Sequence, residues 1–163
     1  MKYLLDTCTI SELVKIAPNV HVRGWFGARK AHELFISAVS WAELHRGVRR
    51  LEPSKRQSDL TRWLNDLEIG FEERILAFDR HVAQTWSEMT VQAETQGKPM
   101  AAFDSMIAAT ARTHGCKLVT RNVRDFAHAG VDLINPWLET DQSETPMINP
   151  RSAPAKTRTS RGN

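Results

Sequence analysis

The sequence predicts an α/β domain of three layers, in which a central parallel sheet of about five strands is flanked by helices. Short apolar runs alternate along the chain with longer segments of helical periodicity. This order is typical of parallel sheets, because their crossover connections are helices that cover both faces. The chain has 163 residues, of which 41% are hydrophobic and 25% charged, and this suits one domain with a single substantial core.

Five short apolar runs are predicted to be strands. The first ends at an acid, Asp6, and the fourth is followed at once by a polar segment that contains Asn122. Runs of this length that carry few polar residues are typical of strands buried on both faces. The runs are residues 2–6, 34–39, 74–78, 116–120 and 131–135.

Six segments with helical patterning lie between these strands. Thr9 and Glu12 have the spacing of a capping box and are predicted to open the first helix. Gly70, Gly97 and Gly115 are predicted to end three of the others. The helical segments are residues 9–15, 22–31, 40–52, 54–69, 79–97 and 98–115.

The basic character of the chain comes mostly from its C-terminal end. The net charge is +3, and from Asp141 onward four basic residues stand against two acidic ones, so the rest of the chain is close to neutral. This end is also rich in Pro, Ser and Thr. We expect a domain over residues 1–138 and a basic, disordered tail over residues 139–163. The tail is either a solvated end or an electrostatic aid to RNA binding.

The cellular compartment is predicted from the N-terminus and the cysteines. The chain begins MKYLLDTC and reaches Asp6 after two leucines, which is unlike a signal peptide. No apolar stretch approaches the roughly 20 residues that a membrane helix needs. Cys8 and Cys116 form no disulfide framework, and the histidines are scattered at no metal-ligand spacing. We expect a cytoplasmic protein with reduced thiols.

Asp104 is the acidic residue that is hardest to explain as ordinary surface. If the helix starts near Pro99, Asp104 falls within an apolar stripe that includes Met100 and Ile107. A carboxylate removed from water without a partner costs several kcal/mol, and a cation shared with other carboxylates would offset that cost. Oxygen ligands favour Mg²⁺ or Mn²⁺ over zinc. The alternative is a first-turn aspartate favoured by the helix dipole.

Other acidic and amide positions have a functional and an ordinary interpretation. Asp6 and Asn122 follow the first and fourth strands, and in a parallel sheet both would face one crevice. Asp6 also suits a turn or a helix cap, and Asn122 with Asp125 suits an Asx-turn that leads into a short helix. Glu43 stands three residues after Ser40, and a capping box would explain it fully.

Four ordered motifs resemble those of PIN-domain ribonucleases, and more narrowly those of the VapC and FitB-like toxins of bacterial toxin–antitoxin pairs. The motifs are LLDTCTISEL, ISAVSWAEL, KPMAAFDSMIAATARTHG and LVTRNVRDF with GVDLINPW, and they span residues 2–137. The resemblance implies a three-layer PIN-like fold and a toxin that hydrolyses RNA phosphodiester bonds with Mg²⁺ or Mn²⁺. It also implies a cognate antitoxin, a homodimer, and contact with DNA only through the antitoxin.

The resemblance also assigns roles to individual residues. Asp6, Glu43 and Asp104 stand where the family has its metal ligands, and together with Asn122 they form the expected catalytic set. Thr120 stands where the family has a hydroxyl near the reacting water. Secondary candidates are Thr7, Ser40, Thr120 and Asp125.

Two positions depart from the family pattern. Cys8 replaces an amide that hydrogen-bonds locally, which predicts a less rigid site, and Asn122 replaces the fourth acid of the FitB-like pattern. Asn122 favours one tightly held ion over two.

The alternative to a ribonuclease is a catalytically silent PIN-fold module that binds RNA or protein, and a further alternative is a DNase or 5′ nuclease. A pure binding module has no use for three acids that repel one another.

Overall fold

The computed structural model describes residues 1–138, and the tail predicted over residues 139–163 lies outside them. Five strands form one sheet in the order β3-β2-β1-β4-β5, and every neighbouring pair is parallel. The strands are β1 (Tyr3–Leu5), β2 (Leu34–Ser37), β3 (Ile75–Leu76), β4 (Lys117–Val119) and β5 (Leu133–Ile134). The predicted α/β class and the number of strands are therefore confirmed, although each strand is shorter than its apolar run.

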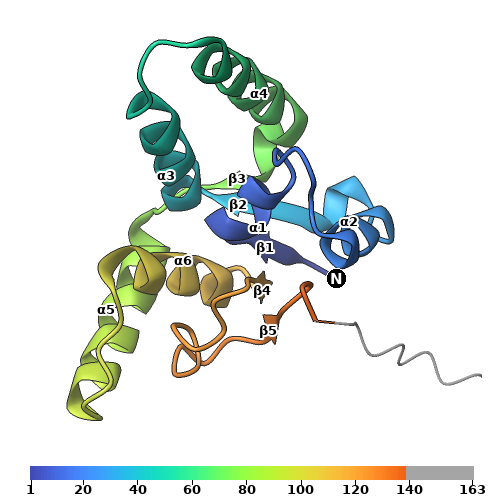
Figure 1. Ribbon diagram of the computed structural model, residues 1–163. Coiled ribbons are helices and arrows are strands. Elements are labelled where there is room, and N and C mark those ends of the chain that lie inside the picture. Colours follow the sequence, from blue (N-terminus) through green and yellow to red (C-terminus); the bar gives the residue numbers. More distant parts are fainter. Residues whose placement is uncertain (139–163) are drawn as a thin grey trace, which may run out of the picture.

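Six α-helices connect the strands and cover the sheet (Figure 1). In Figure 1, α3 and α4 form a hairpin that projects from one side of the sheet, and α5 and α6 pack together on the other side. The helices are α1 (Thr7–Glu12), α2 (Val20–Gly27), α3 (Ala38–Arg49), α4 (Lys55–Phe71), α5 (Arg80–Thr95) and α6 (Ala102–Thr113), with short 3₁₀ turns at Ala31–Glu33 and Glu72–Arg74.

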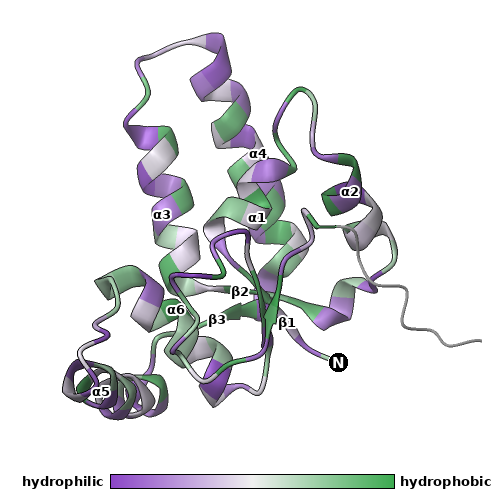
Figure 2. Ribbon diagram, turned by 60° about the horizontal axis from the view of Figure 1, so that its bottom comes forward, coloured by the Kyte–Doolittle hydropathy of each residue, from purple (hydrophilic) through white to green (hydrophobic). Residues whose placement is uncertain are grey.

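The two sides of the sheet bury two separate cores, because successive side chains of a strand point to opposite faces. In β1, Leu4 packs with α5 and α6, in a core that includes Ile107. Tyr3 and Leu5 pack with α1 to α4, in a core that includes Trp25. Figure 2 shows the consequence for hydropathy: the strand ribbons are mostly green, whereas the helices carry both colours.

No helix within residues 1–138 is both long and apolar enough to cross a lipid bilayer. The helices over the sheet keep one polar side, as amphipathic helices of a globular domain do.

The predicted start of the first helix is wrong. Asp6 is the N-cap of α1, and its carboxylate accepts the Thr7 N–H. The Thr9 hydroxyl instead donates to the Val119 carbonyl oxygen at 2.8 Å. This hydrogen bond connects α1 to β4, and Thr9 is not a helix cap. A capping box also requires its glutamate to bond the backbone of the cap residue, and Glu12 bonds other groups.

Two other helix boundaries also differ from their predicted positions. Gly70 does not end α4, which continues to Phe71 and stops at Glu72, a residue with φ of 36°. Glycine costs a helix only about 1 kcal/mol, and Phe71 packs against the core beyond it. The last helix begins at Ala102 rather than near Pro99, since Ala101 is extended. Met100 reaches the core from outside the helix.

Two glycine substitutions test these boundaries. Gly115 adopts φ of 62°, whereas Gly70 lies within α4, and an added Cβ meets nothing within 4 Å at either position. We expect Gly115→Ala to lower the free energy of unfolding by about 1 kcal/mol, because alanine disfavours the left-handed region. We expect Gly70→Ala to raise it by about 0.5 kcal/mol. Urea denaturation measures both, and equal effects would contradict the assignment.

Candidate functional site

The candidate site lies at the carboxyl edge of the two central strands, β1 and β4. Asp6 follows β1 directly and Thr120 follows β4, and both are buried. The Asp6 N–H donates to the Val119 carbonyl oxygen at 3.0 Å, which extends the pairing of the strands by one bond. The sheet order reverses between these strands, and such points in open α/β sheets are where ligands bind.

Three donors hold the Asp6 carboxylate in place. The Thr7 N–H donates to Oδ1 at 2.7 Å, and the Thr120 hydroxyl donates to Oδ2 at 2.7 Å. The Cys8 thiol also donates to Oδ2, at 3.1 Å. Because Asp6 is 5% exposed and its donors come from both α1 and the end of β4, its orientation depends on the tertiary fold.

Glu43 is connected to Asp6 through Thr7. The Thr7 hydroxyl donates to Glu43 Oε2 at 2.6 Å, while the N–H of the same residue bonds Asp6. The capping box that was the alternative explanation for Glu43 does not form, because Ser37 is the N-cap of α3 and its side chain accepts the Ser40 N–H. Glu43 therefore has no capping role, and its side chain turns toward α1.

Asp104 lies in the first turn of α6 and is half-buried. Burial, followed by the negative charges of Asp6, Asp125 and Glu43, raises the pKa of Asp104 to about 6. Its place in the first turn agrees with the helix-dipole explanation of the position, but that dipole favours the ionised form and so acts against a raised pKa. The raised pKa of Asp104 therefore reflects burial first and then repulsion by three nearby acids.

These acids have no cationic partner. Within the described part of the chain, no lysine, arginine or histidine forms an ion pair with Asp6, Glu43, Asp104 or Asp125. The Mg²⁺ or Mn²⁺ expected from the resemblance fits this set, because carboxylate and hydroxyl oxygens are hard ligands and the excess negative charge is otherwise uncompensated.

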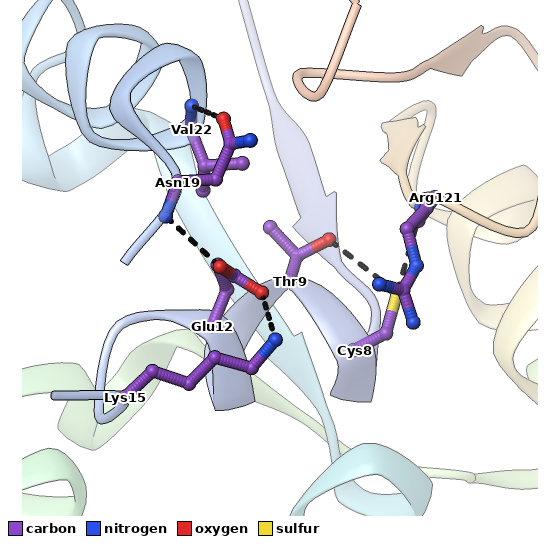
Figure 3. A network of polar contacts seen from close by, with 7 residues as sticks. All are labelled: Cys8, Thr9, Glu12, Lys15, Asn19, Val22 and Arg121. Atoms are coloured by element: carbon purple, nitrogen blue, oxygen red, sulfur yellow. Dashed lines mark hydrogen bonds and ion pairs between the residues drawn. The ribbon is translucent and has the colours of Figure 1, made fainter. Parts of the chain in front are cut away.

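Glu12 shows how the same chain treats a buried acid that has a structural role (Figure 3). Its Oε2 accepts from Lys15 Nζ at 2.6 Å, and its Oε1 accepts the Asn19 N–H at 2.9 Å. These hydrogen bonds lower the pKa of Glu12, so the buried carboxylate is stable as an anion. It connects the end of α1 to the start of α2, and it needs no metal ion.

The acids are near one another but are not in contact. Among residues 1–138, no three His, Cys, Asp or Glu side chains already stand at the spacing of a metal-ligand set. Asp104 interacts with Asp6 and Glu43 through charge, and no hydrogen bond joins them. Such an arrangement is expected of like charges without a counterion, since carboxylates that share no cation or proton separate.

The remaining predicted residues divide into two groups. Thr120 and Thr7 contact the acids directly, as described above, and Asp125 acts on Asp104 through its charge. The Ser40 hydroxyl bonds only the Ser37 hydroxyl, at 2.8 Å, within the cap of α3.

Asn122 is exposed, and its backbone N–H donates to the Thr120 hydroxyl at 3.0 Å. The short helix that the ordinary interpretation places after Asn122 is absent, and residues 123–128 are turns. Asp125 is therefore not a helix cap.

The contribution of Cys8 was not foreseen from the sequence. The thiol donates to Asp6 and is 3.6 Å from the Thr120 hydroxyl. Its sulfur also accepts the Arg121 N–H at 3.5 Å, and Figure 3 shows Cys8 beside Arg121. Burial and the charge of Asp6 raise the pKa of this thiol, which keeps it protonated and able to donate. The signal available in the sequence was a donor two residues after a capping aspartate.

Comparisons with known proteins agree with this geometry. The family model described as PIN domain matches residues 3–131. The VapC ribonuclease Y4jK of Sinorhizobium fredii is 36% identical, over 82% of this chain and 96% of its own length. Toxin FitB of Neisseria gonorrhoeae is 38% identical, over 82% of this chain and 97% of its length. A structure of FitAB bound to an IR36 DNA fragment contains a similar chain, with a TM-score of 0.82 and 35% identity, over 86% and 99% of the two chains.

The raised pKa of Asp104 predicts how stability depends on pH. An acid whose folded-state pKa is raised stabilises the fold below its ordinary pKa of 3.8, and that contribution is lost as the pH rises through about 6. In the metal-free protein, Asp104→Asn should therefore raise the melting temperature by about 3 °C at about pH 7.5, which corresponds to about 1 kcal/mol after allowance for solvent screening. At about pH 4 it should have no effect.

Calorimetry in a chelating buffer measures this difference, and Asp66→Asn on the exposed face of α4 is the matched control. An Asp104→Asn effect that is the same at both pH values would contradict the repulsion.

Thr120→Val tests the support of Asp6. The substitution keeps the shape of the side chain but removes the hydroxyl that donates to the buried carboxylate. We expect the free energy of unfolding to fall by about 1–3 kcal/mol, because a buried charged acceptor loses a donor. Thr61→Val is the control, since the Thr61 hydroxyl is exposed and bonds a carbonyl of its own helix. Equal effects in urea denaturation would exclude a role for Thr120 in holding Asp6.

Proposed function

The chain belongs to the PIN domain family, and from this premise we propose that it is the toxin of a type II toxin–antitoxin pair, an endoribonuclease that hydrolyses RNA phosphodiester bonds with Mg²⁺ or Mn²⁺. The similarity to a VapC ribonuclease and to Toxin FitB, at 36% and 38% identity, supports the reaction and the biological class. In this proposal Asp6, Glu43 and Asp104 hold the ion.

The observation that carries the proposal is a group of acids at one edge of the sheet, where Thr7 bonds both Asp6 and Glu43. The negative charges of these two acids and of Asp125 add to burial in raising the pKa of Asp104, and none of the four acids has a cationic partner within residues 1–138. A fold that only bound RNA or protein would gain stability by replacing one of these acids with a neutral residue. Retaining them is consistent with a divalent cation as the missing partner.

Each residue has a distinct part in the proposed reaction. When bound, Mg²⁺ or Mn²⁺ supplies the Lewis acidity that activates water and neutralises charge developing on the phosphate. Asp6 is an oriented anion, because the Thr7 N–H, the Thr120 hydroxyl and the Cys8 thiol hold both of its oxygens. These bonds leave lone pairs on the carboxylate for a cation.

Fewer hydrogen bonds hold the carboxylates of Glu43 and Asp104 than hold that of Asp6. One Glu43 oxygen accepts from Thr7, which leaves the other available to orient the attacking water. The carboxylate of Asp104 accepts no hydrogen bond within residues 1–138, and the repulsion that raises its pKa would be relieved by a bound cation. Asn122 is exposed at the same edge, where its neutral amide suits contact with substrate better than ligation of a cation.

The partners follow from the same relatives. We propose that a cognate antitoxin covers the acidic site and that the chain forms a homodimer in the cytoplasm. The similarity to FitAB bound to a DNA fragment supports an antitoxin complex that contacts DNA through the antitoxin.

Cleavage of a structured RNA in the presence of Mn²⁺ tests the activity. We expect the native chain to cut and EDTA to abolish cutting, because the acids alone cannot activate water. Asp104→Asn and Glu43→Gln should each lower kcat by at least about 100-fold, a typical cost of losing one group that stabilises the transition state. Asp66→Asn, a matched change on α4, should leave kcat unchanged.

Equal cleavage by all four proteins would indicate a contaminating nuclease. No cleavage by the native chain, together with no Mn²⁺ uptake in calorimetry, would favour the catalytically silent binding module.

A further inference from the structure

One face of α3 carries a positively charged, aromatic groove beside the candidate site. A hollow of about 510 Å³ follows this face, and a smaller one of about 240 Å³ adjoins it. The two share Ala42 and Arg46, and Glu43 lines the smaller one. We call the larger hollow the α3 groove, and its lining residues are Trp41, Ala42, His45, Arg46, Arg49 and Arg50. In Figure 1, α3 rises from the sheet beside α6, the helix that carries Asp104.

The charge of the α3 groove is not neutralised by the rest of the described chain. Arg46, Arg49 and Arg50 form no ion pair and no side-chain hydrogen bond with any residue from 1 to 138, and no acid lines the hollow. Arg46 and Arg49 both lie in the last turn of α3 and are three residues apart, which is about 4.5 Å along the helix axis. Regularly spaced guanidinium groups without carboxylate partners suit a row of phosphates.

The aromatic residues of the groove add a second kind of contact. The rings of Trp41 and His45 pack edge to face, with centroids 4.4 Å apart. His45 Nε2 is buried and has no hydrogen-bond partner among the described residues. Single-stranded nucleic acids bind where bases stack on aromatic rings and phosphates meet basic side chains.

We propose that the α3 groove binds the single-stranded RNA that flanks the bond to be cut, with Arg46 and Arg49 contacting its phosphates and Trp41 and His45 its bases. This inference rests on the proposed ribonuclease function. The groove leads to Glu43 through Arg46, so a strand in it would extend toward the acids. Positive charge here also offsets the repulsion between the phosphates and the acidic site. A contact between copies of the chain would favour a less charged face.

RNA binding by a cleavage-deficient chain tests the proposal. The full chain with Asp104→Asn is titrated in EDTA against a fluorescein-labelled oligouridylate of about twelve nucleotides, and anisotropy is followed over a series of salt concentrations. We expect the added pair Arg46→Ala and Arg49→Ala to weaken binding about tenfold. The slope of log K against log salt should fall by about 1.4, since each lost phosphate contact removes about 0.7 for a single strand.

Two control proteins make the result specific. The pair Arg23→Ala and Arg62→Ala removes the same charge from α2 and α4 and should change the affinity far less, because neither residue lines the α3 groove or the smaller hollow beside it. The pair Arg46→Lys and Arg49→Lys should restore most of the salt slope, since lysine keeps the charge. Restoration by lysine would assign the loss to the removed positive charge, and an unchanged circular dichroism spectrum of the alanine pair would show that this variant is folded.

Three outcomes would overturn the proposal. The first is an unchanged salt slope in the Arg46→Ala and Arg49→Ala pair, and the second is an equal loss in the control pair. The third is a change of sedimentation mass in the alanine pair without a change in RNA affinity, which would assign the groove to a second copy. The cleavage assay distinguishes failure of the proposed function from failure of this inference. If the proposed function is wrong, the native chain does not cut RNA with Mn²⁺, whether or not the α3 groove binds RNA.

Discussion

Mutual repulsion among carboxylates at the carboxyl edge of β1 and β4 is the constraint on which the functional part of this structure depends. Asp6 is held at the end of the central strand by donors from two chain segments, and its charge contributes to raising the pKa of Asp104. A folded protein accepts this cost only where another interaction compensates for it. A divalent cation is the simplest compensation, because it is attracted to every member of the cluster at once.

The helices that bring the acids together also reduce the repulsion between them. The helices α1 and α6 both begin at the same edge of the sheet, with Asp6 as the cap of one and Asp104 in the first turn of the other. Helix N-termini favour negative charge, so the two helix dipoles offset part of the repulsion between the ionised carboxylates. The hydroxyls of Thr7 and Thr120 connect the acids to the backbone of α1 and β4. The packing that stabilises the sheet thus also orients the proposed site.

Charge of the two signs is separated along α3. Glu43 turns toward α1 and the acids, whereas Arg46, Arg49 and Arg50 line the adjoining groove. A phosphodiester must approach negative side chains to reach a cation among them, and an arginine-lined path beside them lowers the cost of that approach. This arrangement makes one helix both a source of a proposed ligand and a proposed substrate contact. The basic tail noted in the sequence is therefore not needed to explain how RNA would be held.

The sequence by itself determined the order of strands and helices, the parallel sheet and the motifs that carry Asp6, Glu43 and Asp104, because periodicity and short motifs are local properties. It misplaced the start of α6 and the end of α4, it assigned to Thr9 a cap that belongs to Asp6, and it left open for Ser40 a cap that belongs to Ser37. A capping spacing in a sequence does not say which hydroxyl faces the helix and which faces a neighbouring strand.

Only the tertiary structure decided that Thr7 joins Glu43 to the N-cap aspartate, that Asp125 acts on Asp104, and that the Cys8 thiol donates to Asp6. Each of these depends on the distance between segments far apart in the chain, which β1 sets by pairing with β2 and β4.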